Sequence, residues 1–123
     1  MSDRDELRSL VASWLEAIRA GDLDGVLARH ADDVVLFDVA PPLCHRGLAA
    51  CREAWAPFLD GGPHRTFELR ELSLHVGADV AFAHALARTD QDEEVAVRVT
   101  LGFAKRGGRW AIVHEHHSAP ITA

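Results

Sequence analysis

The chain has 123 residues, a length that suits one domain with a single hydrophobic core, so we expect one domain over residues 1–123. Hydrophobic residues make up 48% and charged residues 26%, which excludes a disordered, fibrous or membrane composition. The formal net charge is -6 and the basic residues are scattered, so no basic stripe could follow a nucleic-acid backbone. We therefore expect a cytoplasmic protein with no nucleic-acid or membrane partner.

The first half of the chain predicts three helices and one strand. Apolar residues recur three or four positions apart over residues 3–20, which is typical of an amphipathic helix. A short second helix should end near residue 30, and a third should follow Gly47 and end at about residue 59. Between these two helices, residues 34–39 are mostly β-branched and apolar, which predicts a short strand.

The second half predicts four strands, over residues 65–76, 80–89, 95–105 and 110–118. The links between them are short, and one of them is the acidic run at residues 90–94. Short links between consecutive strands imply an antiparallel meander. Helices followed by strands predict an α+β domain, in which one curved sheet folds against its own helices.

The last expected strand contains the sequence IVHEHHS, with three of the eight histidines of the chain. Strand side chains alternate between faces, so His114 and His116 should share a face with Trp110, while His117 should face solvent or an interface. In the neighbouring strands the larger and polar side chains also fall on one face: Phe82, His84, Arg98 and Thr100. We expect this mixed face to line a cavity. The opposite face of residues 80–89 holds only alanines and should pack closely against another surface, such as a second sheet or a subunit partner.

Two parts of the sequence resemble known families. The sequences AGDLDGV at residues 20–26, ADD at 31–33 and LFD at 36–38 resemble the ketosteroid isomerase branch of the NTF2-like superfamily, over residues 10–55. The sequences KRGGRW at 105–110 and IVHEH at 112–116 resemble SnoaL-like proteins, over residues 95–118. The resemblance implies an α+β NTF2-like cone, with three helices packed on a strongly curved, mostly antiparallel sheet around an apolar pocket. It also implies a homodimer that forms through the convex face of the sheet.

The resemblance places the general base of the isomerase family at Asp38. An aspartate in an apolar pocket should have a raised pKa, which would suit a base. The tyrosine and protonated aspartate of the family's oxyanion hole are replaced by Trp14 and Thr100, so ketosteroid isomerisation itself is not expected. We predict catalytic roles for Asp38, His114 and His116, with His84 and Arg98 as further polar partners.

Each of these residues also has a simpler interpretation. Asp38 could brace the Pro41-Pro42 turn, and Arg98 could pair with a carboxylate instead of binding an anionic ligand. A metal bound by His114 and His116 would need a third ligand such as His84, and HEHH is not the HExxH motif, so we expect no metal. The aromatic residues expected to contact a ligand are more often core residues: Trp14, Trp55, Phe58, Phe82 and Trp110.

Two hypotheses remain open from the sequence. In the first, the cone binds a small, largely apolar organic molecule with a carbonyl or acid group and catalyses proton transfer of the isomerase, cyclase or dehydratase type, without a cofactor, since no nucleotide or flavin motif is present. In the second, the domain is a noncatalytic binding or dimerisation module.

Cys44 and Cys51 have neither CxxC spacing nor a disulfide framework, so we expect two reduced thiols.

Overall fold

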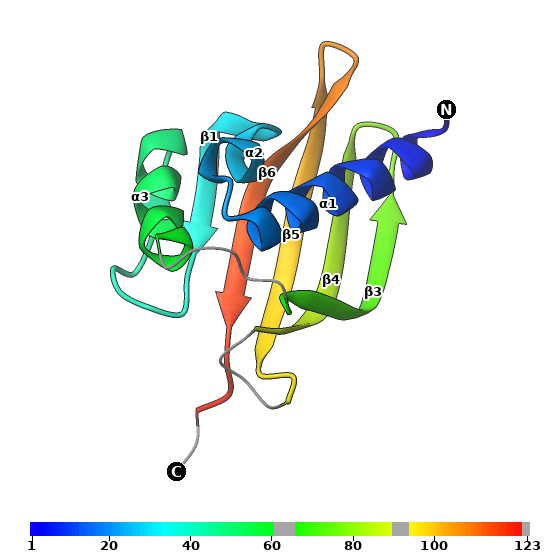
Figure 1. Ribbon diagram of the computed structural model, residues 1–123. Coiled ribbons are helices and arrows are strands. Elements are labelled where there is room, and N and C mark those ends of the chain that lie inside the picture. The colour runs from blue at the N-terminus through cyan, green and yellow to red at the C-terminus, as the bar shows by residue number, and fades with distance from the viewer. Residues whose placement is uncertain (61–65, 90–93, 122–123) are drawn as a thin grey trace.

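The computed structural model describes residues 1–60, 66–89 and 94–121. In this part of the chain, three helices cover one face of a six-stranded sheet (Figure 1). The helices are α1 (Asp3–Ala20), α2 (Leu23–Leu27) and α3 (Leu48–Leu59). The strands are β1 (His30–Phe37), β2 (His45–Arg46), β3 (Glu68–Val76), β4 (Val80–Arg88), β5 (Val97–Arg106) and β6 (Arg109–Ser118). The predicted α+β architecture is confirmed.

The first helix has the bounds that its apolar periodicity predicts. The hydroxyl of Ser2 accepts a hydrogen bond from the Asp5 amide and caps the N-terminus, while Gly21, with φ of 71°, ends the helix in the left-handed conformation that glycine adopts without strain. The apolar stripe is buried against the sheet: Leu7, Leu10, Val11, Trp14 and Ile18. This stripe supplies much of the hydrophobic core.

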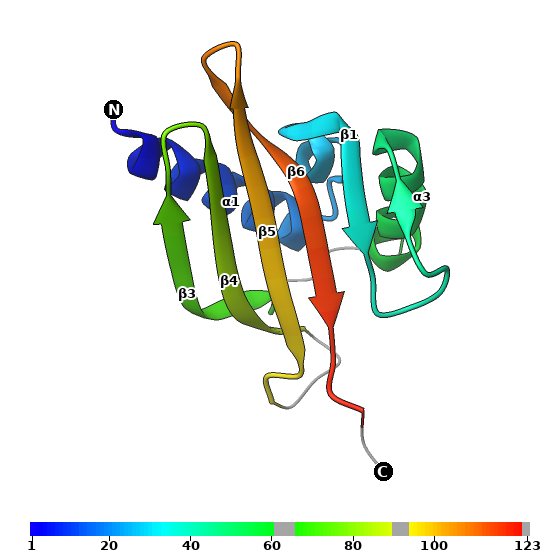
Figure 2. The ribbon, with the colours of Figure 1, turned by 180° about the vertical axis from the view of Figure 1, so that it is seen from behind.

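The strands lie in the order β2-β1-β6-β5-β4-β3. From β3 to β6 they form the predicted antiparallel meander, and β1 pairs with β6 in parallel. The short strand β2, which the sequence did not reveal, pairs with the outer edge of β1. Because β1 and β6 are far apart in sequence, the parallel pair brings a strand of the first half of the chain beside the last strand (Figures 1 and 2).

The alanine-only face of β4 is the inner face of the sheet. Its alanines are buried in the core with the apolar residues of β5 and α1: Ala81, Ala83, Ala85 and Ala87. Small side chains let the helix layer approach the sheet closely. The alanines therefore pack against the protein's own helices, and the expected second sheet or subunit partner is not what covers them. The mixed face of Phe82 and His84 is the outer face, which none of the three described helices covers (Figure 2).

A β-bulge at Val113 reverses the facing of the last strand. Phe103 pairs with Ile112 and Gly102 pairs with His114, so Val113 has no partner on β5. An extra residue in one strand shifts the alternation by one position. Trp110 and Ile112 point into the core before the bulge, and Glu115 and His117 do so after it. The prediction that His114 and His116 share a face with Trp110 is wrong for this reason.

Some expectations fall wholly or partly on positions that are not described. Arg65, the expected first residue of the strand at 65–76, lies outside the described residues, and β3 begins at Glu68. The acidic link at residues 90–94 is described only at its last residue. Among the helices that are described, none has the length and apolar character needed to cross a bilayer.

We expect Gly102→Val to destabilise the protein because it crowds the bulge. A Cβ atom at Gly102 would lie 3.2 Å from the Cβ atom of His114, closer than is usual for such atoms. Overpacking of this kind costs about 1–3 kcal/mol, which thermal unfolding would detect as a lower Tm. Thr100→Val, on the exposed side of the same strand, is the matched control and should change Tm little. Equal Tm values for the two variants would contradict this account of the bulge.

Candidate functional site

The main cavity lies between α3 and the inner face of the sheet and has a volume of about 540 Å³. Most of its wall is apolar: Val39, Ala40, Ala54, Trp55, Pro57, Phe58, Phe67, Ala87, Val97 and Val99. The polar part of the wall comes from Asp38, Thr89 and His117. An apolar wall with a few grouped polar side chains is typical of a site for a small organic molecule.

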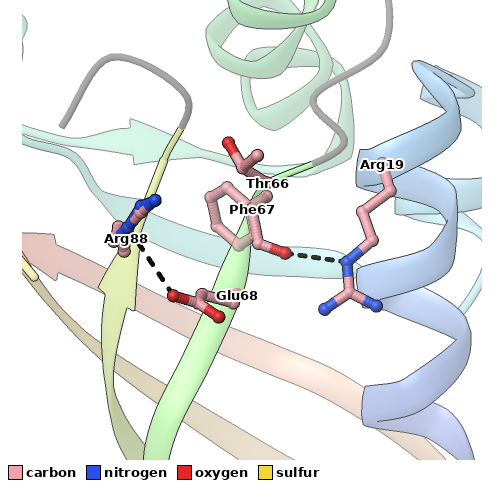
Figure 3. A pocket seen from close by; sticks show the side chains of 5 residues that line it. All are labelled: Arg19, Thr66, Phe67, Glu68 and Arg88. Atoms are coloured by element: carbon pink, nitrogen blue, oxygen red, sulfur yellow. Dashed lines mark hydrogen bonds and ion pairs between the residues drawn. The ribbon is translucent and has the colours of Figure 1, made fainter. Parts of the chain in front are cut away.

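A second, smaller pocket of about 360 Å³ lies where the end of α1 meets β3 and β4 (Figure 3). The Nε atom of Arg19 donates a hydrogen bond of 2.7 Å to the carbonyl of Phe67. The Nε atom of Arg88 lies 3.6 Å from Oε1 of Glu68 (Figure 3). Both guanidinium groups of this smaller pocket thus have an oxygen atom beside them. The main cavity is the better candidate site because its wall contains a carboxylate and an imidazole side by side, those of Asp38 and His117.

A chain of four polar side chains runs from the main cavity into the core. Nδ1 of His117 lies 3.6 Å from Oδ1 of Asp38, which directly follows β1. Nε2 of the same imidazole lies 3.0 Å from Oε1 of Glu115. The other carboxylate oxygen, Oε2, lies 2.5 Å from Nε2 of His30 at the start of β1. The chain therefore connects the cavity wall to a fully buried carboxylate.

Glu115 is 0% exposed, so its charge requires partners inside the protein. Besides the two histidines, the indole Nε1 of Trp55 lies 3.3 Å from Oε2 and the thiol of Cys51 lies 3.6 Å from the same atom. Four side chains from β1, α3 and β6 thus surround one carboxylate. This arrangement explains how an acidic residue is accommodated in the core.

The pKa values of the chain follow from these contacts. Burial by itself raises the pKa of Glu115, but the hydrogen bonds from His117 and His30 outweigh it and hold that pKa far below its usual range. Burial likewise opposes the charged form of His117, yet its two carboxylate neighbours raise the pKa to about 9. The two groups are therefore both charged at neutral pH.

The pKa of Asp38 is lowered, whereas the sequence predicted a raised pKa. The nearby imidazole of His117 lowers the pKa of Asp38 more than burial raises it, and the Val39 amide, 2.8 Å from Oδ1, lowers it further. The expected raised pKa is thus wrong, because the neighbouring cation outweighs desolvation. The contact with Val39 agrees with the local turn role, but Asp38 also lines the cavity.

A possible metal site also involves this chain. One ligand atom each from His30, Cys51 and Glu115 lie within 4.8 Å of one another, and these residue types suit zinc. However, burial and the nearby Glu115 raise the pKa of the Cys51 thiol well above its ordinary value, which opposes the thiolate that a metal needs. Oε2 of Glu115 is also already occupied by donors. These contacts favour a hydrogen-bonded cluster.

The predicted site residues fall into three groups. Asp38, Trp55 and Phe58 line the cavity. Trp14 is buried behind it, with its ring edge-on to Trp55, while Trp110 is buried at the other end of α1 and donates to Asp3.

The remaining predicted residues lie on the outer face of the sheet: Phe82, His84, Arg98, Thr100, His114 and His116. Arg98 donates to the hydroxyl of Ser118, and His114 contacts the carbonyl of Val35 through Nδ1. The alanine face of β4 is the buried one, so the alternate side chains of β4 and of its neighbours point outward. None of the six lines the main cavity.

Sequence reasoning missed His117, Glu115 and His30 as site residues. Strict alternation placed His117 on the outside, because the bulge at Val113 leaves no clear mark in the sequence. A carboxylate between two histidines in IVHEHHS was a signal, but only the pairing of β1 with β6 shows that His30 completes the group.

Three helices over the inner face of a six-stranded, mostly antiparallel sheet define the NTF2-like class of fold. The chain belongs to the SnoaL-like domain family, whose model matches residues 7–122.

Solved structures agree with this assignment. An NTF2-like protein of unknown function from Pseudomonas putida KT2440 has 36% sequence identity and a TM-score of 0.87, and the match covers 99% of this chain and 91% of that one. A proposed dehydratase of the NTF2-like family from Streptomyces avermitilis has 16% identity and a TM-score of 0.78, with coverage of 98% and 97%. A proposed ketosteroid isomerase from Parabacteroides distasonis ATCC 8503 has 19% identity and a TM-score of 0.72, with coverage of 93% and 85%. The last two matches establish the fold alone.

The raised pKa of His117 predicts a loss of stability at alkaline pH. Its pKa is about 9 in the folded protein against 6.5 for an ordinary histidine, so its stabilising effect is complete below pH 6.5 and is lost as the pH rises through 9. Urea unfolding should show a free energy that falls by up to about 3 kcal/mol over this interval. His117→Gln should remove most of the decline, whereas His116→Gln, on the exposed outer face, should keep it. A full decline in His117→Gln would assign the effect to another group.

Proposed function

We propose that the main cavity binds a small, largely apolar organic molecule with a carbonyl group, and that Asp38 and His117 move a proton next to that carbonyl. The observation that carries the proposal is a carboxylate and an imidazole 3.6 Å apart at the wall of an apolar cavity. The side chain of Asp38 is 26% exposed and that of His117 is 13% exposed, so a ligand in the cavity can reach both.

The two groups would divide the chemistry between them. The ionised carboxylate of Asp38 accepts the proton from the carbon next to the carbonyl; the electron pair of the broken C–H bond forms the C=C bond of the enolate, and the π pair of the C=O bond moves onto oxygen. The N–H of His117 at Nδ1 donates a hydrogen bond to the enolate oxygen that forms. Return of the proton from Asp38 to another carbon gives isomerisation. Its transfer instead to a β-hydroxyl group, which leaves as water while the enolate oxygen reforms the carbonyl and the C=C bond shifts to the α and β carbons, gives dehydration.

The lowered pKa of Asp38 makes it a weak base, which limits what it can do alone. Stabilisation of the enolate by an adjacent imidazolium compensates, because it lowers the energy of the product of proton removal. In this proposal His117 takes the role that the sequence assigned to His114 and His116, since those two side chains lie on the outer face. The apolar wall of Trp55 and Phe58 would hold the body of the ligand.

Proton exchange offers a direct test of this function. The protein is incubated in D₂O with cyclohexanone, β-tetralone and acetophenone, and deuterium uptake next to each carbonyl is measured by NMR. We expect uptake above the buffer rate for at least one ketone, and a loss of at least about 100-fold in Asp38→Asn because the base is removed.

Asp60→Asn is the matched control, since Asp60 is exposed at the end of α3 and does not line the cavity. This control should exchange at the rate of the unsubstituted protein. Equal rates for Asp38→Asn and the unsubstituted protein would overturn the assignment of Asp38. The absence of uptake with every ketone would count against the carbonyl chemistry as a whole.

A second candidate function, dimerisation, is favoured by the outer face of the sheet. Large apolar side chains are exposed there beside several histidines: Phe37, Val80 and Phe82. The ring of His75 stacks on Phe82 with centroids 4.6 Å apart, and Phe37 packs edge-on against His114 and His116. A broad face of this kind, uncovered by helices (Figure 2), fits a second copy of the chain in a homodimer.

Phe82→Glu should separate such a dimer, because it places a charge in the middle of the apolar contact. Size-exclusion chromatography with light scattering would report a dimer for the unsubstituted protein and a monomer for this variant. Leu43→Glu is the control, since Leu43 is 95% exposed in a loop, and it should remain dimeric. A monomeric unsubstituted protein, or a dimeric Phe82→Glu variant, would exclude this interface.

A further inference from the structure

We infer that Glu115 is a positioning residue, which keeps Nε2 of His117 protonated so that Nδ1 is the atom that exchanges a proton with the cavity. The inference rests on the proposed function for its catalytic meaning. Its structural part, the identity of the protonated nitrogen, rests on hydrogen-bond geometry and can be measured without a ligand.

The carboxylate of Glu115 can only accept hydrogen bonds when it is ionised. Its oxygen Oε1 lies 3.0 Å from Nε2 of His117, so this nitrogen must carry a hydrogen whether the imidazole is charged or neutral. Neutral His117 then has a hydrogen on Nε2 and a lone pair on Nδ1. The proton that leaves and returns is the one on Nδ1.

The carboxylate is itself prevented from turning away. Its other oxygen, Oε2, is held by His30 at 2.5 Å and by the indole of Trp55 at 3.3 Å. Rotation of the carboxylate would break these contacts inside the core, where no solvent replaces them. The orientation of Oε1 toward His117 is therefore fixed by two other elements of the fold.

The imidazole ring of His117 is also confined. The ring of Trp55 packs against it with centroids 5.6 Å apart and planes at 77°, and Val99 of β5 is its partner across the strands. Nδ1 faces Asp38 at 3.6 Å, a distance longer than an ordinary hydrogen bond. A ligand oxygen near this gap could therefore share the Nδ1 proton.

The charged and titratable groups around His117 come from four elements. Asp38, after β1, and Glu115, on β6, lie next to the imidazole. His45 on β2 acts on the charge of Asp38. His30 on β1 and Cys51 on α3 contact Glu115. Two of them are carboxylates in direct contact with the imidazole. Replacing Glu115 with glutamine removes one of the two negative charges and also removes the obligate acceptor, since an amide can present either oxygen or nitrogen.

The test is ¹⁵N NMR of the imidazole nitrogens, because their chemical shifts distinguish the two neutral tautomers. At a pH above the His117 pKa of about 9, the unsubstituted protein should show Nε2 protonated and Nδ1 unprotonated. In Glu115→Gln, the pKa of His117 should fall by at least about one unit, and the Nδ1–H tautomer should become populated. Glu53→Gln, at an exposed position on α3, should change neither quantity.

A neutral His117 with its hydrogen on Nδ1 in the unsubstituted protein would overturn the inference. This result needs no variant, so the test stands even if Glu115→Gln does not fold. An unchanged tautomer and pKa in a folded Glu115→Gln variant would also overturn it. Failure of the proposed function would appear differently, as an absence of deuterium uptake with the Nε2–H tautomer intact.

Discussion

The buried carboxylate of Glu115 is the constraint on which the rest of the structure depends. Burial of an ionised group is costly unless donors replace water, and here the donors come from both halves of the chain. His30 is contributed by β1, Trp55 and Cys51 by α3, and His117 by β6 itself. The parallel pairing of β1 with β6 and the packing of α3 therefore have to form together for the charge to be tolerated.

The same constraint links the core to the cavity. Because Glu115 binds Nε2 of His117, the imidazole presents Nδ1 to Asp38, and the two carboxylates on either side keep the ring protonated at neutral pH. The imidazole at the cavity wall is thus held in place by its hydrogen bond to Glu115 in the core, while Trp55 and Phe58 form part of the apolar wall. An acid and a base held in this way need little rearrangement when a ligand enters.

The two faces of the sheet have different roles. The inner face is filled by small alanines and by Val99, Leu101 and Phe103, which allows α1 to pack on it. The outer face holds histidines and exposed aromatic rings, and it stays uncovered in the single chain. The proposed catalysis on the inner side and the proposed association on the outer side use different faces, so the two proposals are compatible.

The sequence by itself determined the helices, the meander and the membership of the fold class, because these follow from local periodicity and from family motifs such as LFD at residues 36–38. It also placed Asp38, Trp55 and Phe58 in the cavity. The facing of each strand was decided only by the tertiary structure. One unpaired residue at Val113 exchanges the faces of every later side chain, and the burial of the alanine face of β4 appears only once the helices lie on the sheet. Both are non-local effects, so no pattern within a single strand could reveal that His117, and not His114 or His116, lies beside Asp38.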